Sequence, residues 1–206
     1  MMLAARTAAW KPSRAPLPYD AEVEYLESTG TQYVETGVIP DSNTKISVTT
    51  AVTATTEQFM GAIDNNTNRF HFSFYSGGVF RGCVGRNQIS MGSSDQLVHT
   101  FTLDALNNTV SKDETSYSFM MSGLVPSISI WLFGRNSDNP NYIRRIKIRI
   151  YSCQIYQNGI LVSDFIPVRF INERGETEGA MHDRVSGQLF RNAGTGAFVI
   201  GPDKTT

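Results

Sequence analysis

The chain has 206 residues, a length that fits one sandwich or barrel domain and lies near the lower limit for two compact domains. Hydrophobic residues make up 40% of it and charged residues 18%, which is enough apolar material for one core, and the net charge is −1. This balanced charge gives no overall field to hold nucleic-acid phosphates, and no apolar run approaches the roughly 20 residues of a spanning helix, so we expect neither nucleic-acid binding nor membrane insertion.

Residues 1–20 differ in composition from the rest of the chain. They hold three of the eight prolines and three basic residues, with no acidic residue before Asp20. We expect an extended arm here, followed by a single domain over residues 21–206. Because a pre-extended segment suits docking, we expect the arm to bind other structural protein subunits in an oligomer or larger assembly, the alternative being a linker or leader. The apolar anchors of the arm are Trp10, Leu17 and Tyr19.

From Glu22 onward, apolar and polar residues alternate with a period of two. The clearest runs are residues 47–52, 69–75 and 145–150, where side chains of one kind occupy every second position. Strict alternation indicates strands with one buried face. The nearest candidate for a helix, residues 96–106, also alternates and is better explained as a strand.

Turn-forming residues separate these runs at short intervals. The clearest hairpin signal is Asn158-Gly159, because Asn and Gly both accept the positive φ of a two-residue turn. About a dozen short antiparallel strands in one domain predict an all-β fold, either a sandwich or a barrel. No internal repeat is visible, which argues against a propeller or a solenoid.

Two cysteines, Cys83 and Cys153, are too few for a disulfide framework or a four-ligand zinc site. Each lies in an apolar strand context, and no signal peptide is recognised because Arg6 interrupts the apolar start, so we expect free thiols, the alternative being a cross-sheet disulfide. Residues 64–68 resemble the opening of a calcium loop, but Arg69 stands where that loop needs Gly. We therefore expect no cofactor, with an Asx-rich turn as the preferred interpretation of this segment and Ca²⁺ on a rim loop as the alternative.

Three segments carry recognisable sequence motifs in addition to the alternation. They are EYLESTGTQYVETG at 24–37, YSCQIYQNGILVSDFIPVRF at 151–170 and VSGQLFRNAGTGAFVIGP at 185–202. Together they resemble the concanavalin A-like, laminin-G-like jelly-roll family of phage structural proteins and gut-bacterial surface proteins. The resemblance implies a two-sheet antiparallel jelly-roll sandwich whose first strand lies near its last ones, and a location on a virion or an extracellular surface. We expect the motif residues to determine the fold rather than to bind a ligand. One departure is His182, which precedes Asp183 where the family usually has Tyr.

This superfold hosts lectins, architectural proteins and glycoside hydrolases alike. Retaining β-glucanases of the fold use two carboxylates about 5 Å apart as nucleophile and acid. Glu22, Glu24 and Glu27 have a similar spacing, but the middle residue is Glu rather than Asp and the set opens the domain instead of lying mid-chain. We therefore expect no enzymatic activity. A lectin-like adhesion module ranks first, an architectural virion decoration or cement protein second, and a glycoside hydrolase third.

The expected site for a glycan or cell-surface polysaccharide is the polar face of the strand that contains Phe70, Phe72 and Phe74. Sugar recognition combines a flat aromatic ring with planar hydrogen-bond donors, and both residue types occur on this strand and within a hairpin's distance of it. The candidates are Arg69, His71, Tyr75, Arg81, Arg86 and Asn87, with Asn136 on a rim loop as the next choice. The alternative is a solvated outer face without a ligand.

A second basic set consists of Arg145, Lys147 and Arg149, which alternate with isoleucines. Such a stripe either binds an anionic group or pairs across strands with acidic neighbours such as Glu22 and Glu24. We favour the pairing, because the rest of the chain has no surplus of positive charge.

Overall fold

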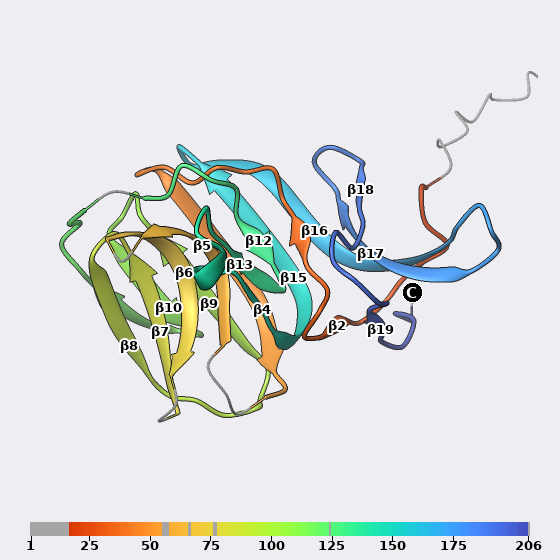
Figure 1. The fold of residues 1–206 in the computed structure, drawn as a ribbon, viewed down its shortest axis with the longest axis horizontal. Helices are drawn as coiled ribbons and strands as arrows, with labels where there is room; N and C mark the ends of the chain where they lie inside the picture. The colour runs from red at the N-terminus through yellow and green to blue at the C-terminus, as the bar shows by residue number, and fades with distance from the viewer. Residues whose placement is uncertain (1–16, 55–57, 66, 76–77, 124, 206) are drawn as a thin grey trace, which may run out of the picture.

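The computed structural model of the chain describes residues 17–54, 58–65, 67–75, 78–123 and 125–205. Within these ranges the regular structure consists of strands and one short 3-10 helix, η1 (Pro140–Tyr142), so the expected all-β fold is confirmed. The strands form two sheets that pack face to face as a β-sandwich (Figure 1). No helix in the described ranges is long and apolar enough to cross a membrane.

Eleven of the described strands form the larger sheet. They are β1 (Ala21–Glu22), β2 (Leu26–Thr29), β4 (Thr44–Val52), β9 (His99–Asp104), β10 (Thr109–Lys112), β11 (Thr115–Ser118), β15 (Lys147–Gln157), β16 (Ile160–Ile171), β17 (Thr177–Asp183), β18 (Leu189–Phe190) and β19 (Val199–Ile200). The main path runs β11-β10-β9-β4-β15-β16-β17-β18, while β1 pairs with β16 and β2 pairs with β15 and β19. In β15 a bulge after Ile150 shifts the alternation, so that Cys153 and Ile155 are buried together with Ile148 and Ile150.

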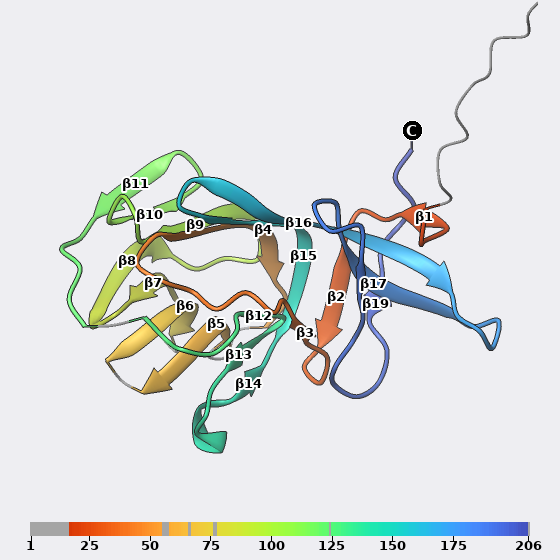
Figure 2. The ribbon, with the colours of Figure 1, turned by 90° about the horizontal axis from the view of Figure 1, so that it is seen from above.

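The other eight described strands form the smaller sheet. They are β3 (Val34–Glu35), β5 (Gln58–Asn65), β6 (Asn68–Tyr75), β7 (Val79–Val84), β8 (Asn87–Ser93), β12 (Trp131–Leu132), β13 (Gly134–Asn136) and β14 (Arg144–Arg145). Their main path runs β14-β13-β5-β6-β7-β8, and β12 lies between β3 and β5. Pairing is antiparallel except between β13 and β5, which are parallel. In Figure 2 the segment with β13 and β14 projects from this layer on the side away from the larger sheet.

The core lies between the two sheets and follows the alternation of the sequence. Phe72 and Phe80 of the smaller sheet meet Phe101 of the larger one, with ring centroids 5.8 and 4.8 Å apart. All three rings are buried, as are Ile46 and Leu103 beside them. Burying one side chain of this size stabilises the fold by about 1.5–3 kcal/mol, so this layer is the main source of cohesion between the sheets.

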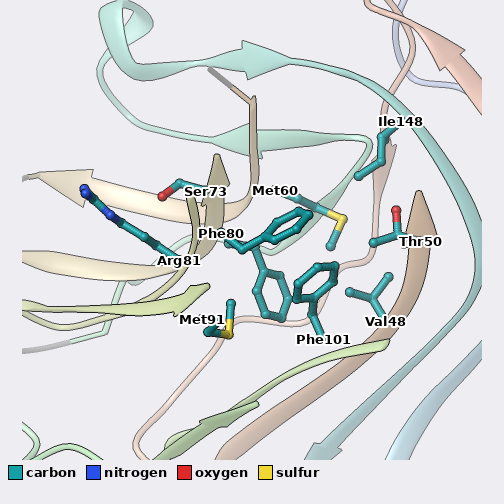
Figure 3. Close-up of a pocket in the computed structure, with 10 residues that line it drawn as sticks. Val48, Thr50, Met60, Ser73, Phe80, Arg81, Met91, Phe101 and Ile148 are labelled. Carbon is teal, nitrogen blue, oxygen red and sulfur yellow. The ribbon is translucent and has the colours of Figure 1, made fainter. Parts of the chain in front are cut away.

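A cavity of about 10 Å³ lies within this core beside Met60, Phe80 and Phe101 (Figure 3). It is about the size of one water molecule, but its mostly apolar lining lacks the two to four polar partners that a buried water needs. Figure 3 also separates the two sides of the smaller sheet, because Ser73 and Arg81 point away from the phenylalanine rings. The cavity is therefore a packing void, and the polar groups of β6 and β7 lie on the opposite side.

Two local predictions are confirmed and one needs correction. Asn158 and Gly159 have φ angles of 52° and 77° and join β15 to β16, as expected for a two-residue hairpin turn. The run 96–106 contains strand β9 and no helix. The run 145–150 is not one strand, because Ile146 interrupts it and its amide donates to the carbonyl of Phe133 at 3.1 Å, which separates β14 from β15.

Residues of the sequence motifs connect the first and last segments of the domain by strand pairing and hydrogen bonds. β2 pairs with β19, as the sequence resemblance implied. The Gln32 side chain accepts from the Thr29 amide at 2.8 Å and donates to the Ala197 carbonyl at 3.0 Å. Thr31 donates from its hydroxyl to the Thr195 carbonyl at 2.8 Å. These polar residues therefore hold two ends of the chain together, which is a structural role.

The larger sheet extends beyond the smaller one, toward the right of Figures 1 and 2, and carries a second small core there. Ile166, Val168, Phe170 and Ala180 form this cluster, against which Leu189 packs. Tyr19 packs on it as well, and its ring centroid lies 4.8 Å from that of His182. Leu17 is 47% exposed, and Trp10 lies outside the described residues. The ring of Tyr19 is thus in contact with its own chain.

Candidate functional site

The side of the smaller sheet that faces away from the core carries most of the predicted glycan residues. Directly paired residues on neighbouring strands point to the same side of a sheet. The register therefore puts one row across β3, β12, β5, β6, β7 and β8, and this row consists of Glu35, Trp131, Gly61, His71, Cys83 and Gln88. We call this side the outer face. With strands about 4.8 Å apart, six strands span about 24 Å.

Buried polar side chains occupy the centre of the outer face. His71 is 3% exposed, Arg135 5% and Arg69 8%. Burial and the positive charges of Arg135 and Arg69 hold the pKa of His71 well below its usual value. The imidazole is therefore neutral at pH 7, and the two guanidinium groups supply the charge of this region.

The two buried arginines are fixed by backbone carbonyls at opposite ends of the face. Arg69 donates from Nε to the Gly85 carbonyl at 2.8 Å and from its Nη2 group to the Arg86 carbonyl, in the turn between β7 and β8. Arg135 donates from Nε and Nη2 to the Tyr142 carbonyl at 3.0 and 2.8 Å, at the end of η1. Hydrogen bonds to charged donors are stronger than neutral ones, so both turns are held firmly against the sheet.

Cys83 lies directly opposite His71 and has its Sγ 3.8 Å from the Ser73 hydroxyl. Burial raises the pKa of the Cys83 thiol, although three arginines near it act in the opposite direction. Burial also raises the pKa of Cys153, which lies in the core. Both cysteines are free and buried, as the sequence predicted, and their protonated state makes them poor nucleophiles.

An aromatic pair occupies the other end of the face. The rings of Tyr33 and Trp131 stack with centroids 3.8 Å apart and an interplanar angle of 23°. Trp131 is buried and donates from Nε1 to Oε1 of the exposed Glu35 at 3.2 Å, whereas Tyr33 is half-buried. The guanidinium carbon of Arg145 lies over the Tyr33 ring, 5.3 Å from its centroid. An accessible ring with a rigid support and an adjacent cation is therefore present.

The structure brings only part of the predicted glycan set together. Arg69, His71 and Arg81 share the outer face, but Arg69 and His71 are buried and Arg81 is only half-buried. Beside Arg81 lies its cross-strand partner Ser90, which is exposed, and Gln88 at the edge is exposed too. The side chain of Tyr75 lies outside the described part of the structure.

The remaining predicted residues lie in a turn or at the ends of strands, and Asn136 is the last residue of β13 rather than part of the expected rim loop. Arg86 is exposed in the turn between β7 and β8. Asn87 donates from Nδ2 to the Met120 carbonyl at 2.9 Å, and Asn136 donates from Nδ2 to the Ser129 carbonyl at 2.9 Å. These two amides tie the segment between β11 and β12 to the smaller sheet, which is a positional role.

Sequence reasoning missed the aromatic pair and Arg135. Tyr33 lies within a segment that resembles a fold motif, and Trp131 stands in a run of apolar residues that resembles ordinary core. The run Ile130-Trp131-Leu132-Phe133 is apolar throughout, so the sequence gives no alternation from which the side of the indole could be predicted. In the structure Ile130 and Leu132 belong to the core cluster, and Trp131 between them points to the other side of the sheet.

One residue of the basic stripe pairs with a carboxylate near the start of the domain. Arg149 donates from Nε to the Glu27 carboxylate at 2.6 Å, and the two are cross-strand partners on β15 and β2. Glu22 lies 4.0 Å from the Lys204 ammonium. The favoured cross-strand pairing is thus present for Arg149, with Glu27 rather than Glu22 or Glu24 as its partner, whereas Arg145 lies over the Tyr33 ring instead.

The segment that resembles a calcium loop forms an Asx-type turn. Asn65 accepts from the amides of Thr67 and Asn68 at 2.8 and 3.0 Å, and Asp64 accepts from the Ser127 amide at 3.0 Å. Among the residues with described positions, no group of three or more His, Cys, Asp or Glu side chains gathers as a metal site would require. These side chains are engaged with backbone amides.

No protein-family model matches the chain, and no curated protein matches it either. Function is therefore inferred from the geometry and chemistry of the outer face.

Proposed function

We propose that the protein is a non-catalytic carbohydrate-binding module whose ligand lies along the outer face of the smaller sheet. The observation that supports this most directly is the stacked pair Tyr33–Trp131, which lies beside the exposed Arg145 and on the same face as the half-buried Arg81. Carbohydrate sites combine an apolar ring, which contacts the C–H faces of a sugar, with planar donors that bind its hydroxyls. Both elements occur on one side of one sheet.

The arrangement is suited to an extended ligand rather than to a single small molecule. Accessible polar groups lie at the two ends of the outer face, with Glu35 at the β3 end and Gln88 at the β8 end about 24 Å apart, while the centre of the row is buried. The ring at the first end is held in place, because Trp131 supports Tyr33 and is itself bonded to Glu35. Groups that are already ordered before binding lose less entropy when a ligand arrives.

Two further considerations support a binding module rather than a hydrolase. Two carboxylates of the set that resembles a catalytic one face positively charged side chains, since Glu27 accepts a hydrogen bond from Arg149 and Glu22 lies near the Lys204 ammonium. The resemblance of the three sequence segments to the concanavalin A-like family favours a jelly-roll topology and a place on a virion or bacterial surface. In that setting the arm over residues 1–20 would attach the module to other structural subunits.

A glycan array probed with the full chain tests the proposal, followed by calorimetric titration of the best ligand. Tyr33→Ala should weaken binding by about tenfold or more, because a ring in a sugar site contributes on the order of 1 kcal/mol beyond its buried area. Tyr25→Ala is the matched control, since Tyr25 is also half-buried and has Arg149 over its ring at 4.6 Å, but lies beside the larger sheet. Full affinity of a folded Tyr33→Ala variant would rule out this site. An empty array would favour the architectural alternative.

A further inference from the structure

We infer that the ligand of the outer face is an acidic polysaccharide, and that Arg145 binds its carboxylate or sulfate group at the Tyr33 end. This inference rests on the proposed function and adds the chemical class of the ligand. It starts from the surroundings of Arg145, the last residue of β14.

Arg145 is exposed, and its guanidinium is held by one contact. Its Cζ lies over the Tyr33 ring at 5.3 Å from the centroid. Within the described part of the chain it takes part in no side-chain hydrogen bond and no ion pair. Its neighbour Arg144 differs, because it donates from Nη1 to the carbonyls of Asn141 and Ile143 at 2.8 and 2.7 Å. Arg145 is therefore the guanidinium at this end that keeps its donors for a ligand.

A guanidinium that lies over an aromatic ring is oriented to bind an oxyanion. The ring contacts the flat face of the group, while the N–H bonds lie in its plane and point outward as a fork. A carboxylate or sulfate accepts two of these bonds at once, which gives strength and direction. Since Trp131 supports Tyr33 from below at 3.8 Å, the whole stack of Trp131, Tyr33 and Arg145 is ordered before the ligand arrives.

The electrostatic surroundings favour an anion in the same place. Arg144 is the cross-strand partner of Arg135, and Arg135 with Arg69 already disfavours a positive charge on His71. Glu35 is the acidic group of this row and keeps its negative charge while it accepts from the Trp131 indole, but Arg135, Arg144 and Arg145 outnumber it at this end. Several fixed positive charges around one exposed guanidinium raise the local concentration of anionic ligands, although the chain as a whole has a net charge of −1.

The experiment compares three polysaccharides with the full chain by calorimetric titration: polygalacturonate as the carboxylated ligand, heparin as the sulfated one, and dextran as the neutral one. We expect at least one acidic ligand to bind about tenfold or more tighter than dextran, and its affinity to fall between about 50 and about 200 mM salt. Arg145→Gln should weaken that binding by about tenfold, as expected for the loss of a hydrogen-bonded ion pair. The control is Arg174→Gln, which removes the same charge from an exposed position after β16.

Each alternative outcome is decisive. Equal binding of dextran and the acidic ligands, unchanged in Arg145→Gln, would overturn the acidic ligand and leave the proposed function intact. Binding of inorganic polyphosphate as tight as that of polygalacturonate or heparin would show an unspecific anion surface and would also overturn it. If none of the polysaccharides binds and the glycan array is empty, the proposed function itself fails.

Discussion

Gly61 is the residue on which the close packing of the outer face depends most directly. It lies at the centre of the row, beside His71, with a φ of 131°. A Cβ atom added there would lie 2.3 Å from the Phe70 carbonyl oxygen and 2.8 Å from the His71 Cα. Both are backbone atoms, which cannot move without disturbing the pairing of β5 with β6. Gly61→Ala should therefore destabilise the protein through backbone strain and through steric overlap.

The expected size follows from these two terms. A non-glycine residue at such a φ costs about 1–3 kcal/mol, and forcing an extra methyl group into a packed site costs about 1–3 kcal/mol more. The two terms together predict a loss of about 2–6 kcal/mol, which for a chain of this length lowers the melting temperature by about 4–24 °C. Thermal unfolding followed by circular dichroism measures it, with urea unfolding as an independent check.

Gly37→Ala separates the two terms. Gly37 also has a positive φ, 73°, but a Cβ added there meets no atom within 4 Å, so only the backbone cost applies. If Gly61→Ala loses no more stability than Gly37→Ala, then the close approach of β5 to β6 is not as described.

Two further predictions concern titration and reactivity. The free energy of unfolding should fall as the pH drops below about 6.5, because the unfolded state protonates His71 while the lowered pKa keeps it neutral in the folded state. The variant His71→Gln should reduce the slope of this free energy against pH by up to 1.36 kcal/mol per pH unit. An unchanged slope, measured by urea unfolding at several pH values, would contradict the prediction. Cys83 and Cys153 should resist alkylation in the native protein, since both are buried and burial raises the pKa of both thiols. Both should react once the protein is unfolded, without any reductant. Rapid labelling of either cysteine in the native state, detected by mass spectrometry, would refute their burial.

The sequence predicts those parts of the structure that local interactions determine. Alternation specifies strands such as β4 and β6, since one strand needs only a consistent buried face. Asn158-Gly159 specifies its own turn, because the conformation depends on two adjacent residues. Where a distant contact intervenes, the local pattern fails. The interruption at Ile146 follows from a hydrogen bond to Phe133, on which the alternation of residues 145–150 has no bearing.

The polar face of β6 is a second case in which the local pattern predicts only part of the structure. Alternation correctly separated Arg69 and His71 from the phenylalanines of the core, but it could not show that both would be buried. Their burial depends on neighbours that come from far along the chain, such as Arg135, which reaches β5 by a parallel pairing. A residue type on a strand therefore predicts a side of the sheet, while its accessibility is a property of the assembled sheet.

The aromatic end of the candidate site is the part furthest from what a sequence pattern reveals. Tyr33, Trp131 and Arg145 come from three separate segments, and each has an ordinary local explanation as motif, core or basic stripe. They meet because β3 pairs with β12 and β13 pairs with β14, so the chemistry arises from strand order. The geometry of the stack should therefore depend on these strand pairings and change when either pairing is disturbed. Gly134 permits the close approach of β14, since a Cβ there would lie 2.6 Å from the Arg144 carbonyl oxygen. The position of Arg145 over Tyr33 therefore depends on Gly134, which is the cross-strand partner of Arg145.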